Sequence, residues 1–156
     1  MTENQVVIVL VDLDDDDRHH LEQKLYSLLA YCNPAPTTSF HFAIEELEAW
    51  FFGDKNALLA AYPNAKLDVL SQYQQDSICG TWEMLADAIY LGGVAMLKTQ
   101  GKSAVQDAKR EWAKNIAPKM KVEDNRSPSF QEFYRTILRS MCYADGSREL
   151  REIDNL

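Results

Sequence analysis

Cysteine is scarce in this sequence, and long apolar segments are absent from it. The 156 residues include only three cysteines, which lie far apart. This odd number and wide spacing fit neither a disulfide framework nor a CxxC metal site, so we expect reduced thiols. The most apolar stretch, VVIVLV at 6–11, is too short for a membrane span, and the first residues, MTENQ, lack the basic charge of a secretory signal. These absences favour a soluble, cytoplasmic protein with no membrane segment.

Several catalytic motifs are missing as well. The sequence has no GxSxG motif around a nucleophilic serine, and the pair Gly92-Gly93 lacks the lysine and the hydroxyl residue of a phosphate-binding P-loop. Positive charge is in deficit, because 24 Asp and Glu residues outnumber 16 Lys and Arg residues and give a net charge of −8. Such a chain repels polyphosphates overall, so contact with nucleic acid requires a local basic patch or a bridging divalent cation.

The length predicts one domain with a hydrophobic core. The chain has 156 residues and is 46% apolar, which suffices for one core but not for two. The β-branched run Val6–Val11 predicts a strand covered on both faces, and the alternation in Ser39–Ala43 predicts a second, short strand. Periodicity, N-caps and breakers predict helices at about residues 18–31, 44–52, 54–62, 81–91, 103–116 and 130–143. Asp54 is an N-cap candidate, and the helix at 103–116 has one apolar face, formed by Val105, Ala108, Trp112 and Ile116. We expect a helix-rich α/β domain over residues 1–156, frayed at 145–156.

Dense negative charge follows the first strand directly, at Asp12 and at Asp14–Asp17. In open α/β sheets, ligands bind where the carboxyl ends of strands run into loops. Side chains two positions apart on an extended segment point the same way, so Asp12 and Asp14 can converge on a hard divalent cation such as Mg²⁺. The alternative is that these acids only solubilise the strand end and that Asp15–Asp17 favour the start of a helix.

A second acidic cluster follows the second strand. Glu45 and Glu48 are three positions apart and would share one face of the helix predicted at 44–52, whereas Glu46 would point elsewhere. If both strands belong to one sheet, these acids come near Asp12. A site of three carboxylates could hold one or two metal ions for phosphoryl transfer. The alternative is a solvated helix face beside buried apolar residues.

Basic residues gather late in the sequence, with Trp112 among them. They could form a local cationic face for phosphates, or an ordinary helix surface with ion pairs to the interspersed acids. The basic residues are Lys98, Lys102, Lys109, Arg110, Lys114, Lys119, Lys121 and Arg126.

Three segments together resemble the bacterial DUF4276 family, a group similar to the Toprim fold of topoisomerases, primases and OLD-type nucleases. The first is VVIVLVDLDDDD at 6–17. The second is IEELEAWFFGD at 44–54 with AYP at 61–63, and the third is AKREWAKNIAPKM at 108–120 followed by NRSPSF at 125–130. The DxD pattern by itself is common, and the specificity comes from the other segments in the same order.

The resemblance implies a Toprim-like, Rossmann-like partial parallel sheet with C-terminal helices. Asp12 and Asp14 match the family's DxD metal site, and Glu46, Glu48 and Asp54 lie in the matching acidic segment. The implied cofactor is Mg²⁺ or Mn²⁺, with Asp12, Asp14 and Glu48 as the catalytic residues. The implied activity is that of a nuclease or phosphoryl-transfer protein in a bacterial defence or genome-maintenance system, with nucleic acid as the substrate and an AAA/ABC-type ATPase as the partner.

The sequence departs from the Toprim pattern in one respect. A Toprim site also uses a glutamate in a motif similar to VEGxTE after its first strand, and this sequence has no such motif. The resemblance therefore implies that the N-terminal part of the fold is missing here or comes from another chain. This leaves a second hypothesis open, a non-catalytic interaction module that docks an ATPase or forms homo-oligomers, because an unpaired edge strand pairs readily with another chain.

Overall fold

The computed structural model describes residues 6–144. The order of its elements is β1 (Val6–Asp12), α1 (Arg18–Leu29), β2 (Thr37–Ala43), α2 (Glu48–Gly53), α3 (Lys55–Ala61), α4 (Leu67–Gln72), α5 (Thr81–Ile89), α6 (Gly93–Thr99), α7 (Lys102–Ile116), two short 3₁₀ turns (Ala117–Lys119 and Val122–Asp124) and α8 (Pro128–Ala144). The helix-rich α/β class predicted from the sequence is confirmed. The predicted fraying of 145–156 lies outside the described residues.

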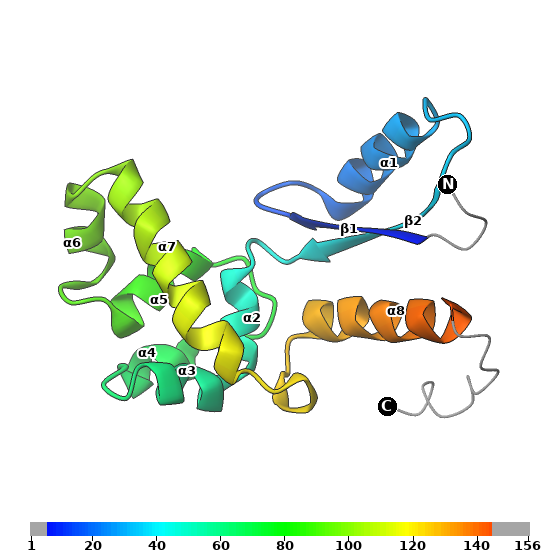
Figure 1. Ribbon diagram of the computed structural model, residues 1–156. Coiled ribbons are helices and arrows are strands. Elements are labelled where there is room, and N and C mark those ends of the chain that lie inside the picture. Colours follow the sequence, from blue (N-terminus) through cyan, green and yellow to red (C-terminus); the bar gives the residue numbers. More distant parts are fainter. Residues whose placement is uncertain (1–5, 145–156) are drawn as a thin grey trace.

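Within this range the two strands form one small parallel sheet. The register pairs Val6 with Thr37 and Asp12 with Ala43, so both carboxyl ends meet at one edge. Figure 1 shows α1 on one side of the sheet and α8 on the other, with α2–α7 gathered beyond its carboxyl edge. Both predicted strands are present. The sheet edge at Asp12 therefore faces the helical part of the molecule.

Aromatic contacts hold α1 and α8 against β2. Tyr26 of α1 meets Phe40 edge to face, with ring centroids 4.9 Å apart. On the other side, Phe133 of α8 lies 5.6 Å from the His41 ring and 5.3 Å from the Trp50 ring. Helix α1 itself has no buried residue, although Asp17 caps its start by accepting a hydrogen bond of 2.8 Å from the His20 N–H. No residue of β1 is buried, whereas three residues of β2 are, so the prediction that Val6–Val11 is covered on both faces is wrong.

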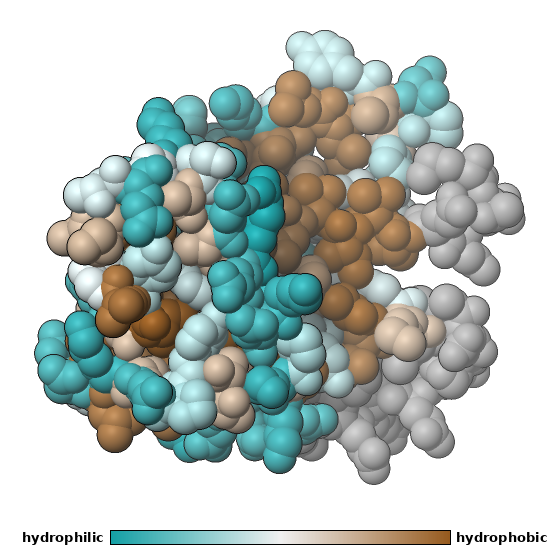
Figure 2. All heavy atoms as spheres, turned by 60° about the vertical axis from the view of Figure 1, so that its left-hand side comes forward, coloured by the Kyte–Doolittle hydropathy of each residue, from teal (hydrophilic) through white to brown (hydrophobic). Residues whose placement is uncertain are grey.

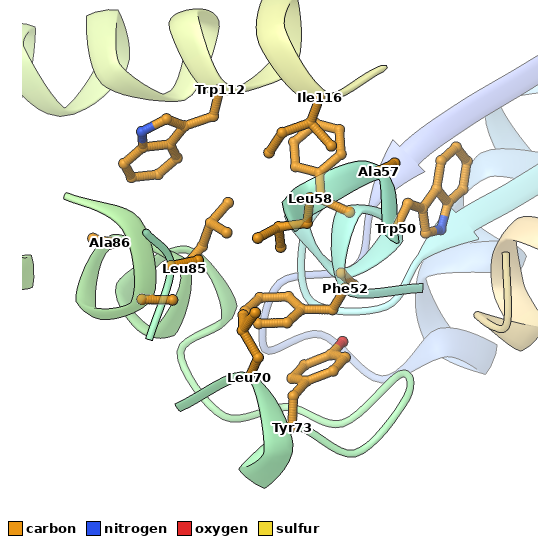
Figure 3. Close-up of a cluster of buried hydrophobic side chains, with 14 of the residues drawn as sticks. Trp50, Phe52, Ala57, Leu58, Leu70, Tyr73, Leu85, Ala86, Trp112 and Ile116 are labelled. Carbon is orange, nitrogen blue, oxygen red and sulfur yellow. The ribbon is translucent and has the colours of Figure 1, made fainter. Parts of the chain in front are cut away.

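The main core lies among the helices α2–α7 (Figure 3). Phe52 of α2 stacks on Tyr73 at 4.2 Å between centroids, and Trp112 and Ile116 of α7 are buried above Leu58. Burying a side chain of this size stabilises a fold by about 1.5–3 kcal/mol. The apolar face predicted for α7 is confirmed, and it takes Trp112 out of the basic surface where the sequence had placed it.

Helix α8 is anchored by a chain of polar contacts around the segment NRSPSF. Asp76 accepts hydrogen bonds from the Ser127 hydroxyl at 2.7 Å and from the Ser129 N–H at 2.6 Å. The Ser129 hydroxyl in turn accepts one from the Trp50 indole N–H at 2.9 Å. Ser127 also caps the helix by accepting from the Phe130 N–H at 3.2 Å. Two of the family-like segments, EAWFFGD and NRSPSF, are thus joined in the structure.

The helix predicted at 44–52 begins later than expected. Backbone pairing of the two strands continues past their ends, since the Leu13 N–H bonds to the Ala43 carbonyl and the Asp14 N–H to the Glu45 carbonyl. Glu45 has φ of 61°, a left-handed conformation that no helix contains, and α2 starts only at Glu48. Pairing with β1 outweighs the local helical preference there. The prediction that Glu45 and Glu48 share a helix face is therefore wrong.

Candidate carboxylate site at the sheet edge

Asp12 lies at the junction between the sheet and the helices. One of its carboxylate oxygens accepts a hydrogen bond of 3.0 Å from the Leu47 N–H, which ties the end of β1 to the segment before α2. Partial burial of the carboxylate raises the pKa of Asp12, and the charge of Asp14 adds to this effect. The Leu47 hydrogen bond and the positive charge of Lys109 act in the opposite direction without cancelling it. The net rise therefore comes mainly from the partial burial of the carboxylate.

Glu46 and Glu48 converge on Lys109, which comes from α7. The Lys109 ammonium lies 3.0 Å from a carboxylate oxygen of Glu46 and 3.4 Å from one of Glu48. Glu48 is only 5% exposed. Burial raises the pKa of Glu48 to about 7, against the opposing effect of Lys109 and with a further contribution from Glu46. Burial also raises the pKa of Glu46, and the charge of Asp12 adds to the rise.

Lys109 keeps its charge in this setting. Burial by itself would lower the pKa of Lys109, but Glu48 and Glu46 together raise it above its ordinary value. The ammonium is therefore positive at neutral pH and balances one carboxylate. Three carboxylates, those of Asp12, Glu46 and Glu48, share this single cation. We call these four residues the acidic cluster. With all three carboxyl groups ionised, it has an excess of negative charge that a divalent cation would offset. Because the pKa of Glu48 is about 7, a proton on Glu48 offsets part of this charge near neutral pH.

The structure places Asp14 and Asp54 outside the acidic cluster. Asp14 is exposed in the loop after β1, with φ of 48°. Asp54 is 2% exposed and caps α3, since one carboxylate oxygen accepts from the Ala57 N–H at 2.9 Å and the other from the Lys121 N–H at 2.8 Å. The sequence had correctly placed Asp54 at a helix N-cap. With both oxygens accepting backbone hydrogen bonds, Asp54 supports the packing of α3 against the segment after α7.

Glu45 also has a structural role, because its carboxylate binds backbone groups at the start of α5. Its carboxylate accepts hydrogen bonds from the N–H groups of Cys79, Gly80 and Thr81, at 3.1, 2.7 and 2.9 Å, and from the Thr81 hydroxyl. These groups surround the start of α5, whose first residue is Thr81. Burial tends to raise the pKa of Glu45, but these hydrogen bonds together lower it. Glu45 therefore joins the sheet edge to α5 and turns away from Glu46 and Glu48.

Sequence reasoning found Lys109 only as one of many basic residues. Nothing in the sequence shows that it contacts Glu46, which lies 63 positions earlier. The one available signal is that Lys109 belongs to the family-like segment AKREW and lies one position after Ala108, which is buried in the core. That position suggests a lysine close to the protein interior, but not which acids it meets.

The donor set of the acidic cluster fits Mg²⁺ or Mn²⁺. Within residues 6–144, no three His, Cys, Asp or Glu side chains converge closely enough to hold a metal ion by themselves. Magnesium does not require such a cage, because it is usually bound through one or two carboxylates together with waters and substrate phosphates. Asp12 has one oxygen that accepts no hydrogen bond from the described residues, and Glu46 lies within its electrostatic reach. These two residues would hold such an ion, and Asp14, whose charge acts on Asp12 from the neighbouring loop, would add a further oxygen ligand.

A helix-rich α/β domain with carboxylates at the edge of a parallel sheet is the class that the fold and the site define. The chain belongs to the DUF4276 family, described as a domain of unknown function, whose family model matches residues 2–138. No curated protein and no solved structure matches the chain. Among the described residues, no helix is both long and apolar enough to cross a membrane.

Proposed function

We propose that this protein is a Toprim-like, divalent-metal-binding domain that acts as a nuclease or other phosphoryl-transfer enzyme. The observation that carries the proposal is the unbalanced charge of the acidic cluster. Glu46 and Glu48, before and at the start of α2, pair with Lys109, and the charge of Asp12 at the end of β1 acts on Glu46, at the edge of the sheet where α/β proteins bind ligands. A single lysine does not balance them. Glu48 is buried and Glu46 is half-buried, and negative charge at such positions is costly unless a cation compensates it.

The residues of the acidic cluster have distinct roles in this proposal. Asp12 and Glu46 would hold Mg²⁺ or Mn²⁺, and such an ion would supply polarisation of a phosphoryl oxygen and a lowered pKa of a water molecule. Glu48, with its pKa near neutrality, is placed to accept a proton from an attacking water. Lys109 orients the two glutamates and lies where it can contact a phosphate oxygen. Asp14, in the exposed loop beside Asp12, is a further ligand in this proposal.

Metal binding is the first test of this function. Isothermal titration of the protein with Mn²⁺ should show binding that the double variant Asp12→Asn/Glu46→Gln abolishes. Asp15→Asn is the matched control, because Asp15 is an exposed acid of the same loop. It should bind Mn²⁺ with unchanged affinity. Equal affinity of the double variant and the wild type would remove the metal site, and with it the proposed function.

Cleavage is the second test. We expect the protein with Mn²⁺ to cleave single- or double-stranded DNA or RNA and the Glu48→Gln variant to lose this activity. General-base catalysis contributes about 10²–10⁴-fold, so the loss should be of that order. The proposed setting is a cytoplasmic defence or genome-maintenance system in which an AAA/ABC-type ATPase is the partner. Copurification with such an ATPase, and cleavage that depends on ATP, would support that setting.

A second candidate function is a non-catalytic interaction module, and the open side of β1 favours it. Within residues 6–144, β1 pairs only with β2, so its other edge offers free backbone groups to a strand of another chain. Val6 of β1 and Tyr26 and Leu28 of α1 are 41%, 48% and 57% exposed. Figure 2 shows apolar surface gathered in the half of the molecule that holds the sheet. These features suit self-association or docking to an ATPase.

Light scattering during size-exclusion chromatography separates the two candidates. A dimer that persists on dilution, together with no cleavage of any nucleic acid, would support the module. Replacing Val9 of β1 by proline should then give a monomer, because proline removes a backbone donor and does not fit a central strand. A monomeric wild-type protein that cleaves nucleic acid would favour the enzyme.

A further inference from the structure

A pocket beside the acidic cluster combines an aromatic side chain with several lysines. Its volume is about 380 Å³, within the range of ligand-binding pockets. It lies between the start of α5, the end of α6 and the first half of α7. The residues that line it are Trp82, Lys98, Gly101, Lys102, Val105, Gln106 and Lys109.

The side chains that line this pocket include lysines and no acid, although acids outside the lining pair with two of the three lysines. Three lysines line it, in a protein whose net charge is −8. Lys98 pairs with Glu83 at 3.2 Å, so part of its charge is balanced, whereas no acid pairs with Lys102 among the described residues. Lys109 has its partners in the acidic cluster. A local cationic surface of this kind is what an acidic protein needs in order to contact phosphates.

Trp82 provides the aromatic wall. It is half-buried at the start of α5, and the Lys98 ammonium lies 5.2 Å from the centre of its ring. Trp50 and Trp112 are buried in the core, at 7% and 3% exposure, so neither can stack on a ligand. The Lys98 side chain is 54% exposed and has a flexible stem, so it can leave the ring for a phosphate oxygen when a base stacks on the indole.

Lys109 connects the pocket to the acidic cluster. It lines the pocket and also contacts Glu46 and Glu48. A polymer with an aromatic base in the pocket would therefore have its next phosphate beside those carboxylates. The pocket offers a tryptophan and three lysines, and the last of these lysines, Lys109, contacts the acidic cluster. A protein segment or a lipid would not use all of these groups together. Single-stranded nucleic acid has both the bases and the repeated phosphates.

The geometry points to a binding site for one nucleotide of a single strand, with the base stacked on Trp82 and the flanking phosphates held by Lys98, Lys102 and Lys109. This inference rests on the proposed function in one respect only, namely that the bound nucleic-acid strand continues from the pocket to the acidic cluster. It names the substrate class as single-stranded nucleic acid. It also explains why the basic residues near the end of α6 and the start of α7 gather on one surface. Binding in this pocket does not itself need a metal ion.

Fluorescence anisotropy with EDTA present tests this site apart from any metal-dependent step. The probes are labelled oligomers of dT and of rU, each of about 12 nucleotides, at low salt. The wild type should bind at least one of them, and the better-bound oligomer identifies DNA or RNA as the substrate. Trp82→Ala should weaken binding about tenfold or more, because stacking on one aromatic ring makes a contribution of that size. Failure of the wild type to bind either oligomer would overturn the site.

Two lysine variants on α7 test the pocket independently, in case the Trp82→Ala protein does not fold. Lys102→Ala should weaken binding several-fold and reduce the slope of log affinity against log salt by about 0.7, the value for one phosphate contact on a single strand. Lys114→Ala is the matched control, since Lys114 is an exposed lysine of the same helix outside the pocket. It should change neither value. If Lys102→Ala and Lys114→Ala lost the same affinity for the oligomer, binding would be a general electrostatic attraction without a defined pocket. That result would overturn the site.

The outcome is independent of the metal experiment. Oligomer binding that depends on Trp82 and Lys102, in a protein that binds no Mn²⁺, would keep the pocket and remove the proposed nuclease. Binding of Mn²⁺ through Asp12 and Glu46, with no oligomer binding in EDTA, would do the reverse.

Discussion

Asn125 packs directly against the backbone of Gly53, at the point where two family-like segments of the chain meet. The Asn125 amide donates a hydrogen bond to the Trp50 carbonyl at 2.9 Å and accepts one from the Ser127 N–H at 2.9 Å. A Cβ atom placed on Gly53 would lie 2.7 Å from Asn125 Cγ. Asn125 is 3% exposed, and these two hydrogen bonds fix both the nitrogen and the oxygen of its amide group. The glycine in FFGD is therefore required by this close approach.

Gly53→Ala should destabilise the fold by about 1–3 kcal/mol, the usual cost of overpacking. Alanine normally stabilises a helix relative to glycine, so a loss would reverse the ordinary effect at a position within α2. Urea denaturation followed by circular dichroism measures the difference. The double variant Gly53→Ala/Asn125→Ser removes the clash and should show a smaller additional cost for the alanine. If Gly53→Ala lowered the free energy of unfolding equally with Asn or Ser at position 125, the close contact between Gly53 and Asn125 would be contradicted.

Glu45→Gln should also destabilise the protein, by about 1–3 kcal/mol, because it removes the charge from hydrogen bonds at the start of α5. The pKa of Glu45 is lowered in the folded state, so the stability it contributes is present above its unfolded pKa and is lost as the pH falls through the folded pKa. The difference between wild type and variant should therefore shrink in acid. Chemical denaturation over a range of pH measures it.

Two observations check that Glu45 acts as a structural cap. The Glu45→Gln variant should bind Mn²⁺ as tightly as the wild type, and Glu123→Gln, at an exposed acid, should leave the stability unchanged. A loss of Mn²⁺ affinity in a folded Glu45→Gln protein would instead return Glu45 to the acidic cluster.

Glu48 should give the opposite dependence on pH. Its pKa is raised from 4.5 to about 7 by burial, so between these values the folded state holds a proton that the unfolded state has released. The contribution of Glu48 to stability is therefore present below its unfolded pKa and decreases as the pH rises from about 4.5 to about 7. One proton changes stability by at most about 1.4 kcal/mol per pH unit.

Glu48→Gln isolates this effect, because glutamine keeps the shape and cannot ionise. The variant should become more stable relative to the wild type as the pH rises through the same range. Denaturation midpoints at several pH values, without divalent metal, give the comparison. A constant difference at all pH values would show that Glu48 does not titrate in this range. Added Mn²⁺ should stabilise the wild type more than the variant if Glu48 lies next to the ion.

The sequence by itself determined the elements and their boundaries at several places. The β-branched run at Val6–Val11 was enough to predict a strand, although not its burial, and the aspartate at 54 was enough to predict an N-cap, because both signals depend on neighbouring residues. The spacing of Ala108, Trp112 and Ile116 predicted the buried face of α7 for the same reason. The gathering of carboxylates after both strands indicated the edge of the sheet as the candidate site.

Only the tertiary structure decided which charged groups meet. Parallel pairing of β1 with β2 delays α2 to Glu48, and this delay separates Glu45 from Glu46 and Glu48. The packing of α7 then brings Lys109 between those two glutamates and leaves Trp82, not Trp112, beside the lysines of the pocket. These contacts join residues far apart in the chain, and each depends on how whole helices pack. Local periodicity carries no information about such partners, because a helix shows in its sequence which face is buried but not what that face meets.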